Sequence, residues 1–386
     1  MIRLSKLYIR NCGVFSNHLI DFTQDGIPQD LICLSGVNGS GKTTILELIF
    51  NLASFLTPRF FNKNRLFFDR LKPHILTRTE FAQLDLIINE NKLLSLVFGE
   101  EEEIQYDKKY EESQCFVIVS EEIKSIIQNI EDTIVKSPEE EEEYRLDERT
   151  KRQFIRFLTD LTDKEFDTFQ KERNIRNQEI LNDFFKAIEE HIEKEINYAD
   201  TDHLQLPYFF LFNSHDREIL DIRYTSLPKN KSTYNIVYSY NPKRDDLEKL
   251  LVFYNYAYPE RYESLVKWIN KHILSDQKIE KINKPDFQVV MKTKQGKEHG
   301  IELLSSGEES LLILAIQIYL KASQNSIILI DEIDQSLHPE FQEKAIKMLR
   351  ELQREKGCQI VVTSHSDIIW NAFEEKSIIR LTEVLE

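Results

Sequence analysis

One eight-residue segment limits the possible folds of this chain more than any other: Gly36-Val37-Asn38-Gly39-Ser40-Gly41-Lys42-Thr43, which fits the pattern GxxxxGK(S/T). The apolar run 31–34 precedes it and the apolar, helix-like run 45–52 follows it. Glycines let the backbone amides turn inward around a phosphate, and a helix that begins near Lys42 adds the positive end of its dipole. The segment therefore predicts a phosphate-binding loop between a strand and a helix of an α/β fold.

Two side chains of this loop are expected to contact the nucleotide or its metal ion. Lys42 would reach the β- and γ-phosphates of a nucleotide, and the Thr43 hydroxyl would ligate Mg²⁺. We expect the loop to bind the nucleotide through Gly36, Asn38, Gly39, Ser40, Gly41, Lys42, Thr43 and Thr44.

A second feature is the aliphatic run 327–330, which ends in Asp331 and Glu332. A continuous aliphatic run is typical of a central parallel strand, whose end would bring Asp331 beside the phosphate loop to hold Mg²⁺. Glu332 would polarise the attacking water. An ordinary acidic turn after a strand is the alternative for this segment alone.

Upstream lies Leu304-Ser305-Ser306-Gly307-Glu308, at the start of an expected helix over 310–322. Ser306 and Gly307 would offer free amides, a hydroxyl and the helix dipole to an anion, beside Glu308. One phosphate cannot easily occupy two distant helix starts within one subunit, so we expect a second subunit to supply this site. As an isolated segment it would be an ordinary helix cap.

Downstream, Asp334 follows the acidic pair, and a helix is expected from Pro339 to Lys356, where Gly357 ends it. The next buried strand, 359–363, leads to His365, which can donate to a γ-phosphate. On its own, His365 would more often be a residue at a helix start.

Composition restricts the remaining choices. The 386 residues carry a net charge of −16, concentrated in 100–143, which argues against non-specific duplex binding by the whole surface. The four cysteines, Cys12, Cys33, Cys115 and Cys358, match no metal-ligand spacing. Since no run of about 18 apolar residues occurs, we expect no membrane span and a cytoplasmic protein.

The periodicity of apolar residues changes in the middle of the chain. Helical spacing in 123–134, 154–161 and 180–196 predicts an inserted helical subdomain over 120–200. The predicted domains are therefore 1–119 with the phosphate loop, 120–200, and 201–386. Strands are expected in 2–22, 81–88, 93–98, 117–118, 206–212 and 287–292 and near Ile301, a helical stretch over 247–273, and a loop over 225–245.

Together these motifs resemble the ABC-type ATPases, in the soluble branch that includes RecF, the SMC proteins and the overcoming-lysogenisation-defect nucleases. The resemblance covers residues 1–60 and 300–380, with a weaker match at 206–220. It implies an α/β ABC-type P-loop head with an N-terminal antiparallel β subdomain and an inserted helical lobe. It also implies ATP and Mg²⁺ as cofactors.

Carried over by position, the resemblance assigns Walker A to Gly36–Thr43, Walker B to 327–331 with Asp331 and Thr43 on the metal, and the signature to 304–308. It makes Glu332, His365 and Lys42 catalytic, Asp334 the D-loop residue, and Arg10-Asn11 to Ser16 a segment near the nucleotide. No glutamine fits the Q-loop, since Gln83 lies in an expected hairpin.

The signature Ser-Ser-Gly-Glu and the Leu-His-Pro after the D-loop resemble bacterial ATPases of antiphage systems such as PARIS and Septu. This resemblance implies an ATPase that dimerises, or forms a larger homo-oligomer, around ATP–Mg²⁺. Its expected output is the control of a separate effector nuclease. The alternatives are a RecF- or SMC-like ATPase that binds DNA directly, and the ATPase subunit of a membrane transporter.

Overall fold

The computed structural model describes residues 1–57, 74–128, 168, 171–192, 194, 206–219, 234–242 and 245–381. The chain forms two compact units. The parallel-sheet unit comprises Met1–Ile2, Gln29–Asn38 and His191–Leu381, and the mixed-sheet unit comprises Arg3–Pro28 and Gly39–Glu190. The phosphate-loop segment contributes its first three residues to the parallel-sheet unit and the others to the mixed-sheet unit.

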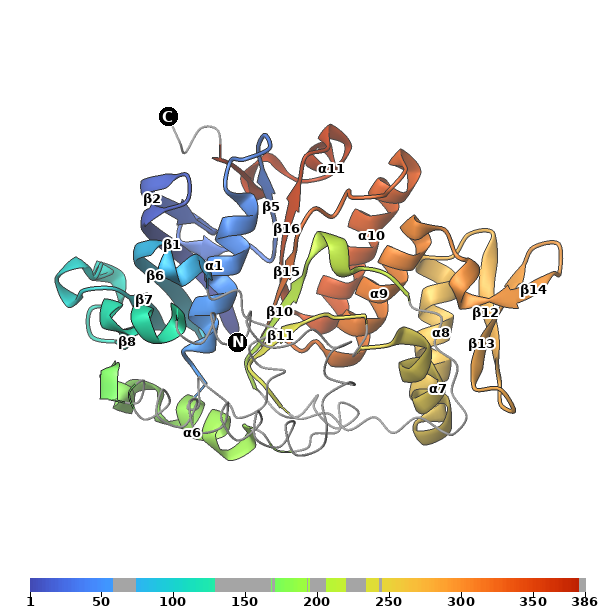
Figure 1. The fold of residues 1–386 in the computed structure, drawn as a ribbon, viewed down its shortest axis with the longest axis horizontal. Helices are drawn as coiled ribbons and strands as arrows, with labels where there is room; N and C mark the ends of the chain where they lie inside the picture. The colour runs from blue at the N-terminus through green and yellow to red at the C-terminus, as the bar shows by residue number, and fades with distance from the viewer. Residues whose placement is uncertain are drawn as a thin grey trace, which may run out of the picture. The chain divides into compact units, whose positions relative to one another are not determined.

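The parallel-sheet unit is built on a six-stranded sheet in the order β11-β10-β15-β16-β5-β17 (Figure 1). Its neighbouring strands are all parallel. The central strand β15 is fully buried along its length, as expected for a strand covered on both faces. The strands are β5 (Leu31–Ser35), β10 (Tyr208–Phe212), β11 (Val237–Ser239), β15 (Ser326–Ile330), β16 (Gln359–Ser364) and β17 (Ile378–Arg380).

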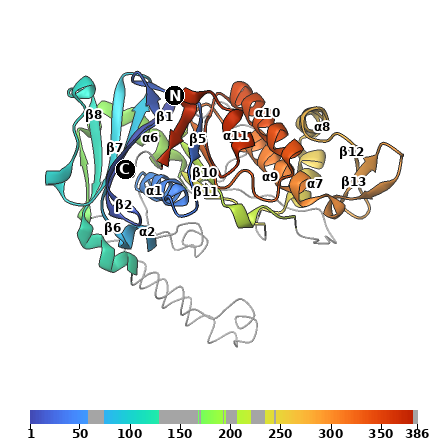
Figure 2. The same cartoon turned by 90° about the horizontal axis from the view of Figure 1, so that it is seen from above.

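Among its described residues this unit has five α-helices: α7 (Leu247–Ala257), α8 (Pro259–His272), α9 (Ser306–Lys321), α10 (Pro339–Lys356) and α11 (Asp367–Asn371). Figure 2 shows α9, α10 and α11 on one side of the strands. Helix α8 packs on α9 through Trp268 and Tyr319. Beyond them lies a small antiparallel sheet of β12 (Gln277–Asn283), β13 (Gln288–Thr293) and β14 (Glu298–Gly300).

Aromatic side chains anchor β10 in the sheet. Tyr208 stacks on Phe210 at 5.4 Å between ring centroids, and Phe210 stacks on Phe212 at 6.5 Å. Tyr234 and Tyr238 meet this row edge-on, so the rings interlock in the T-shaped geometry that aromatic pairs prefer. This row of rings holds β10 up to its last residue, Phe212, after which the chain leads to the segment that contains Arg217.

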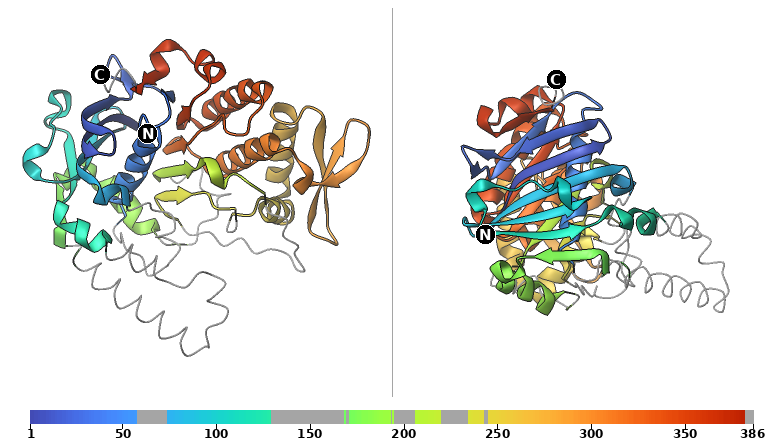
Figure 3. Two further views of the ribbon diagram at one scale, coloured as in Figure 1. Left: turned by 45° about the horizontal axis from the view of Figure 1, so that its top comes forward. Right: turned by 90° about the vertical axis from the view of Figure 1, so that its left-hand side faces the viewer.

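The mixed-sheet unit contains a second six-stranded sheet, in the order β2-β1-β6-β7-β8-β9 (Figure 3, right). Helix α1 packs against β6 and β7. The helices and strands in the described part of this unit are β1 (Ile2–Cys12), β2 (Phe15–Asp21), the short pair β3 (Thr23–Gln24) and β4 (Ile27–Pro28), α1 (Lys42–Ser54), α2 (His74–Thr77), β6 (Thr79–Ile88), β7 (Lys92–Phe98), β8 (Gln114–Val119), β9 (Arg173–Arg176) and α6 (Asn182–His191).

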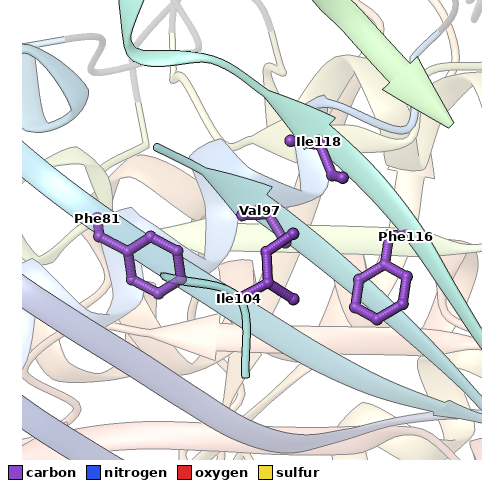
Figure 4. Close-up of a cluster of buried hydrophobic side chains, with 5 residues drawn as sticks. All are labelled: Phe81, Val97, Ile104, Phe116 and Ile118. Carbon is purple, nitrogen blue, oxygen red and sulfur yellow. The ribbon is translucent and has the colours of Figure 1, made fainter. Parts of the chain in front are cut away.

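The segment 99–113, which connects the parallel strands β7 and β8, covers one face of this sheet. Its Ile104 packs into a buried cluster with Phe81, Val97, Phe116 and Ile118 (Figure 4). Apolar burial of this kind stabilises by about 25 cal/mol per Å². The connection is therefore part of the core of the unit.

Most sequence-based predictions of elements are confirmed. The strands expected at 31–34, 81–88, 93–98, 117–118, 206–212, 287–292, 327–330 and 359–363 correspond to β5, β6, β7, β8, β10, β13, β15 and β16. Helix α10 begins at Pro339 and ends at Lys356, and Gly357 adopts φ +62° at its C-terminus, as predicted.

Other predictions need correction. The expected antiparallel β subdomain is a mixed sheet, because β7 and β8 run parallel. Strand β9 lies within the stretch 120–200 expected to be helical, and β11 lies within the expected loop 225–245. The stretch 247–273 is helical as predicted, in two helices that meet at Tyr258, and the strand expected near Ile301 is β14, which ends directly before it.

The helix expected over 154–161 lies outside the described residues, so the division into three domains stays a prediction. Among the described residues, the four cysteines are buried free thiols. No helix in that part of the chain combines the length and apolar character needed to cross a bilayer.

Candidate active site

The carboxyl ends of four parallel strands bring the predicted site residues of the parallel-sheet unit to one edge. Ser35 pairs with Ser364, and Ile330 lies opposite both Val362 and Phe212. The next residues along these strands begin the phosphate loop, the acidic pair, the switch-histidine segment and the segment after β10. Ligand sites of open α/β sheets lie at this edge.

Thr363 joins the two acidic residues of Walker B. Its hydroxyl donates to Asp331 Oδ1 (2.8 Å) and accepts from the backbone N–H of Glu332 (2.7 Å). Asp331 N–H in turn donates to Phe212 O on β10 (2.9 Å). Asp331 is therefore held from both neighbouring strands, with one carboxylate oxygen fixed by Thr363.

Glu332 has an unusual backbone conformation. Its φ is +44°, in the left-handed region that residues other than glycine rarely adopt. Its N–H is bound by Thr363, and its carbonyl oxygen accepts from Arg217 Nη2 (2.7 Å) and from the N–H of Gln335 (2.9 Å). These bonds stabilise the conformation and fix where the side chain leaves the backbone.

His365 lies next to two acidic residues, Glu332 and Asp334. Its Nε2 is 3.6 Å from Glu332 Oε1, and its backbone N–H donates to the Asp334 carboxylate at 3.3 and 3.4 Å. The structure thus brings together Asp331, Glu332, Asp334 and His365 as the sequence predicts. A carboxylate that can accept a water proton lies beside an imidazole that can donate to a phosphate.

The second half of the phosphate loop lies in the mixed-sheet unit. Gly39 and Gly41 have φ of +83° and +89°, and α1 begins at Lys42. A Cβ on Gly41 would lie 2.5 Å from the Phe15 ring, whereas one on Gly39 would meet nothing within 4 Å. Lys42 is buried and its Nζ donates to Ser40 Oγ at 3.4 Å.

This loop fits the triphosphate of ATP. The open space at Gly39, the left-handed glycines and the helix start at Lys42 are the backbone features that let amides surround a phosphate. Lys42 places a cation at this loop, and the Thr43 hydroxyl at the start of α1 is an oxygen ligand of the kind that Mg²⁺ prefers. ATP would bring the bond to be hydrolysed, and Mg²⁺ would neutralise charge on its phosphates.

The turn between β1 and β2 contacts the start of α1. A Cβ on Gly13 would lie 3.7 Å from Thr44 Oγ1, and Phe15 and Val14 surround Gly41. Arg10 forms ion pairs with Glu80 and Glu103. The part of 10–16 that meets the phosphate loop is therefore the turn 13–15, and Arg10 is engaged by carboxylates.

The signature segment forms a capped helix start. Ser305, not Ser306, is the N-cap of α9: its Oγ accepts from Glu308 N–H, and the Glu308 carboxylate accepts from the Ser305 N–H and hydroxyl. Ser306 and Gly307 form the first turn of the helix. A Cβ on Gly307 would lie 3.3 Å from the Leu337 side chain, so the D-loop packs against this turn.

The sequence patterns do not indicate Thr363 or Arg217 as site residues, and they place Ser305 in the signature segment without a role of its own. Ser305 had a visible signal, because the N-cap position favours serine three residues before a glutamate. Thr363 ends an apolar strand, and Arg217 lies in an irregular segment; only the register of β10, β15 and β16 places them at Walker B. Gln83 is buried in β6 and bonded to Asp85 and Gln105, which agrees with its exclusion from the Q-loop.

The charge of Arg217 is buried beside the acidic residues. Burial lowers the pKa of its guanidinium to about 10, and the nearby Asp331, Asp334 and Glu332 oppose that change. A group with a pKa near 10 is protonated at neutral pH, so the acidic cluster includes one buried cation.

Solved structures that are similar to this chain include three SMC head domains. The SMC head domain from Thermotoga maritima is 13% identical, with 96% of this chain and 92% of that chain covered and a TM-score of 0.39. An Smc head domain with an extended coiled coil, bound to the C-terminal domain of ScpA from Pyrococcus furiosus, is 12% identical, with coverage of 96% and 92% and a TM-score of 0.39. An SmcHead bound to the C-winged helix domain of ScpA is 12% identical, with coverage of 98% and 97% and a TM-score of 0.43.

No curated relative matches this chain. A family model described as "AAA ATPase domain" matches residues 2–370. Because that match spans nearly the whole chain, and the site has the groups the reaction needs, the chain belongs to the AAA ATPase domain family and is an ATPase that uses ATP and Mg²⁺.

Proposed function

We propose that this ATPase is a nucleotide-driven switch that closes as a homodimer around two ATP–Mg²⁺. In each site one subunit contributes Lys42, Thr43, Asp331 and Glu332, and its partner contributes the start of α9. Hydrolysis then reopens the dimer, as expected when γ-phosphate contacts hold the closed state.

The observation that carries this proposal is the path of the segment from Glu332 to Leu337. Its first residue is next to His365, and its last two residues, Ser336 and Leu337, lie against Gly307 at the start of α9. A change at the water-activating carboxylate therefore reaches the signature turn within the same unit over six residues.

We assign each residue one role in this switch. Glu332 activates water, His365 and Lys42 contact the γ-phosphate, and Asp331 with Thr43 holds Mg²⁺. At the start of α9 the partner-facing groups are the hydroxyl of Ser305 and the amides of Ser306 and Gly307, with Glu308 as their internal cap. The exposure of Ser305 and Ser306 supports this assignment.

The proposed output is the control of a separate effector nuclease, in a bacterial antiphage system. This part rests on the resemblance of the signature and of Leu337-His338-Pro339 to such ATPases. Charge also favours a protein partner over duplex DNA: on the β12–β14 sheet Lys278, Lys281 and Lys292 pair with the glutamates of that sheet. Paired lysines offer little attraction to phosphates.

The test of closure uses Glu332→Gln, which should bind ATP but hydrolyse it slowly. Light scattering after gel filtration with ATP and Mg²⁺ should show a dimer for this variant. The same variant carrying Ser305→Arg should stay monomeric and keep its affinity for ATP. A Glu332→Gln protein that is monomeric at saturating ATP would disprove the sandwich.

The proposed control of an effector nuclease is tested with the same Glu332→Gln variant, tagged and recovered from its native host. A co-purified polypeptide with nuclease activity that changes when ATP is hydrolysed would support the effector proposal. Recovery of a dimer bound to DNA, with salt-sensitive affinity and no protein partner, would favour the RecF- or SMC-like alternative.

A further inference from the structure

Arg217 is a buried arginine with unusually few hydrogen bonds. It is 7% exposed, and its Nη2 donates to the Glu332 carbonyl oxygen at 2.7 Å. Its Nε and Nη1 are also buried, and neither has a hydrogen-bond partner among the described residues. A guanidinium has five donors, so this side chain is held in a place where most of its bonding capacity is unused.

Such an arrangement is costly to the folded state. A buried charge loses its hydration, and a buried donor without an acceptor adds a further penalty. Arg217 makes no ion pair within 4 Å that would offset these costs among the described residues, although Asp331, Asp334 and Glu332 act on it electrostatically. Stability therefore does not explain an arginine at this position.

The acceptor of its hydrogen bond suggests another explanation. The bond goes to the peptide of Glu332, the residue with φ +44° whose side chain activates water. Thr363 holds the N–H of that residue and Arg217 holds its carbonyl. The two side chains therefore hold Glu332 in its left-handed conformation from opposite sides.

Arg217 itself is firmly placed. It follows Phe212, the last residue of β10, after a short turn in which Asn213 Nδ2 donates to Asp216 Oδ2 at 2.7 Å. Two residues further on, Ile219 N–H donates to the Glu309 carboxylate of α9. The segment is thus fixed on both sides of Arg217, which lets the guanidinium act as a rigid support.

We propose that Arg217 is a positioning residue for ATP hydrolysis, which holds the peptide of Glu332 so that its carboxylate is aimed at the attacking water. It contacts neither nucleotide nor metal in this role. The inference depends on the ATPase activity of the chain and not on the proposed dimer or partner.

The test compares Arg217→Met, Arg217→Gln and Arg217→Lys with the wild-type protein. Met keeps the volume without charge or donor, Gln keeps a neutral donor, and Lys keeps a charged donor. We expect Met to lower single-turnover hydrolysis by about 10- to 100-fold, the range for residues that orient a site group. The Kd for ATP with Mg²⁺ should change by less than about 2-fold, and Lys should recover most of the rate.

Three controls separate positioning from general damage. Arg354→Met makes the same change at an exposed arginine of α10 and should leave the rate unchanged. In a Glu332→Gln background, Arg217→Met should slow single-turnover hydrolysis by less than about 2-fold, because residues that act as a unit are not additive. Thermal melting of Arg217→Met should show no loss of stability, since a costly buried charge has been removed.

Three results would overturn the proposal. The first is hydrolysis by Arg217→Met at the wild-type rate. The second is a rise in Kd as large as the fall in rate, which would place Arg217 in nucleotide binding. The third is an undiminished effect of Arg217→Met in the Glu332→Gln background. If Arg217→Met melts early, the same three comparisons apply to Arg217→Gln.

Discussion

Asp85 gives the mixed-sheet unit a stability that depends on pH. The side chain is 1% exposed; its Oδ1 accepts from Ser95 Oγ at 2.6 Å and from Gln83 Nε2 at 2.9 Å. Its Oδ2 is buried without a hydrogen-bond partner among the described residues. Burial outweighs these two bonds and raises the pKa of Asp85 to about 7.

The direction of the effect follows from proton linkage. The ordinary pKa of an aspartate is 3.8, and with that value in the unfolded chain the folded state binds more protons than the unfolded state between pH 4 and 7. The free energy of unfolding therefore falls as pH rises through this window. A difference of about three pKa units corresponds to at most about 4 kcal/mol, which is fully lost above pH 7.

The difference in stability between Asp85→Asn and the wild type should change with pH across this window. At pH 8 the variant is expected to be more stable than the wild type by about 1–3 kcal/mol, because no buried charge forms and one buried amide donor offsets part of the gain. At pH 5 the wild-type carboxyl is protonated, so the variant should be equal or less stable.

Urea unfolding of the full chain at pH 5, 6, 7 and 8, followed by far-UV circular dichroism, measures the difference. Asp183→Asn, at an exposed aspartate of the same unit, is the matched control and should show no such trend. A difference between Asp85→Asn and wild type that stays constant from pH 5 to 8 would refute the buried-charge reasoning.

Three further predictions concern the phosphate loop and the helix start. Lys42→Ala should weaken ATP binding by at least about 100-fold in a fluorescent-nucleotide titration, as expected when a charged donor to phosphate is lost; unchanged binding would remove Lys42 from the site. Gly41→Ala should abolish ATP binding and lower the melting temperature, because the new Cβ meets Phe15 at 2.5 Å and φ is +89°. Gly296→Ala, at φ +85° with nothing within 4 Å, controls for strain alone and should cost about 1–2 kcal/mol. Ser305→Ala should destabilise α9 by about 1 kcal/mol in thermal unfolding, whereas Ser306→Ala should not; equal losses would contradict the N-cap assignment.

The sequence predicts the backbone structure around the candidate site well where local chemistry determines it. The glycines of the phosphate loop, the aliphatic β15 before Asp331, and the Pro339 and Gly357 boundaries of α10 each have one physical reason for their place. These features depend on backbone conformation and strand burial, which a short segment of sequence already encodes.

Features that depend on distant pairing could not be predicted. Strand β9 is polar and four residues long, and only its pairing with Phe116–Val119 of β8 makes it a strand. The parallel pairing of β7 with β8 requires the segment 99–113 to cross over the sheet, which no local pattern indicates. Arg217 becomes a site residue only because β10 lies next to β15.

The cap of α9 has a consequence for how readily two subunits associate. Glu308 already fills the anion-binding end of its own helix, with its carboxylate accepting from the Ser305 N–H and hydroxyl and from Gln277 Nε2 at 2.8 Å. In the proposed dimer, a γ-phosphate from the other subunit must compete with this resident carboxylate. Such competition would lower the affinity between the subunits of the proposed dimer and set a threshold, so that association would respond only to a fully loaded nucleotide site.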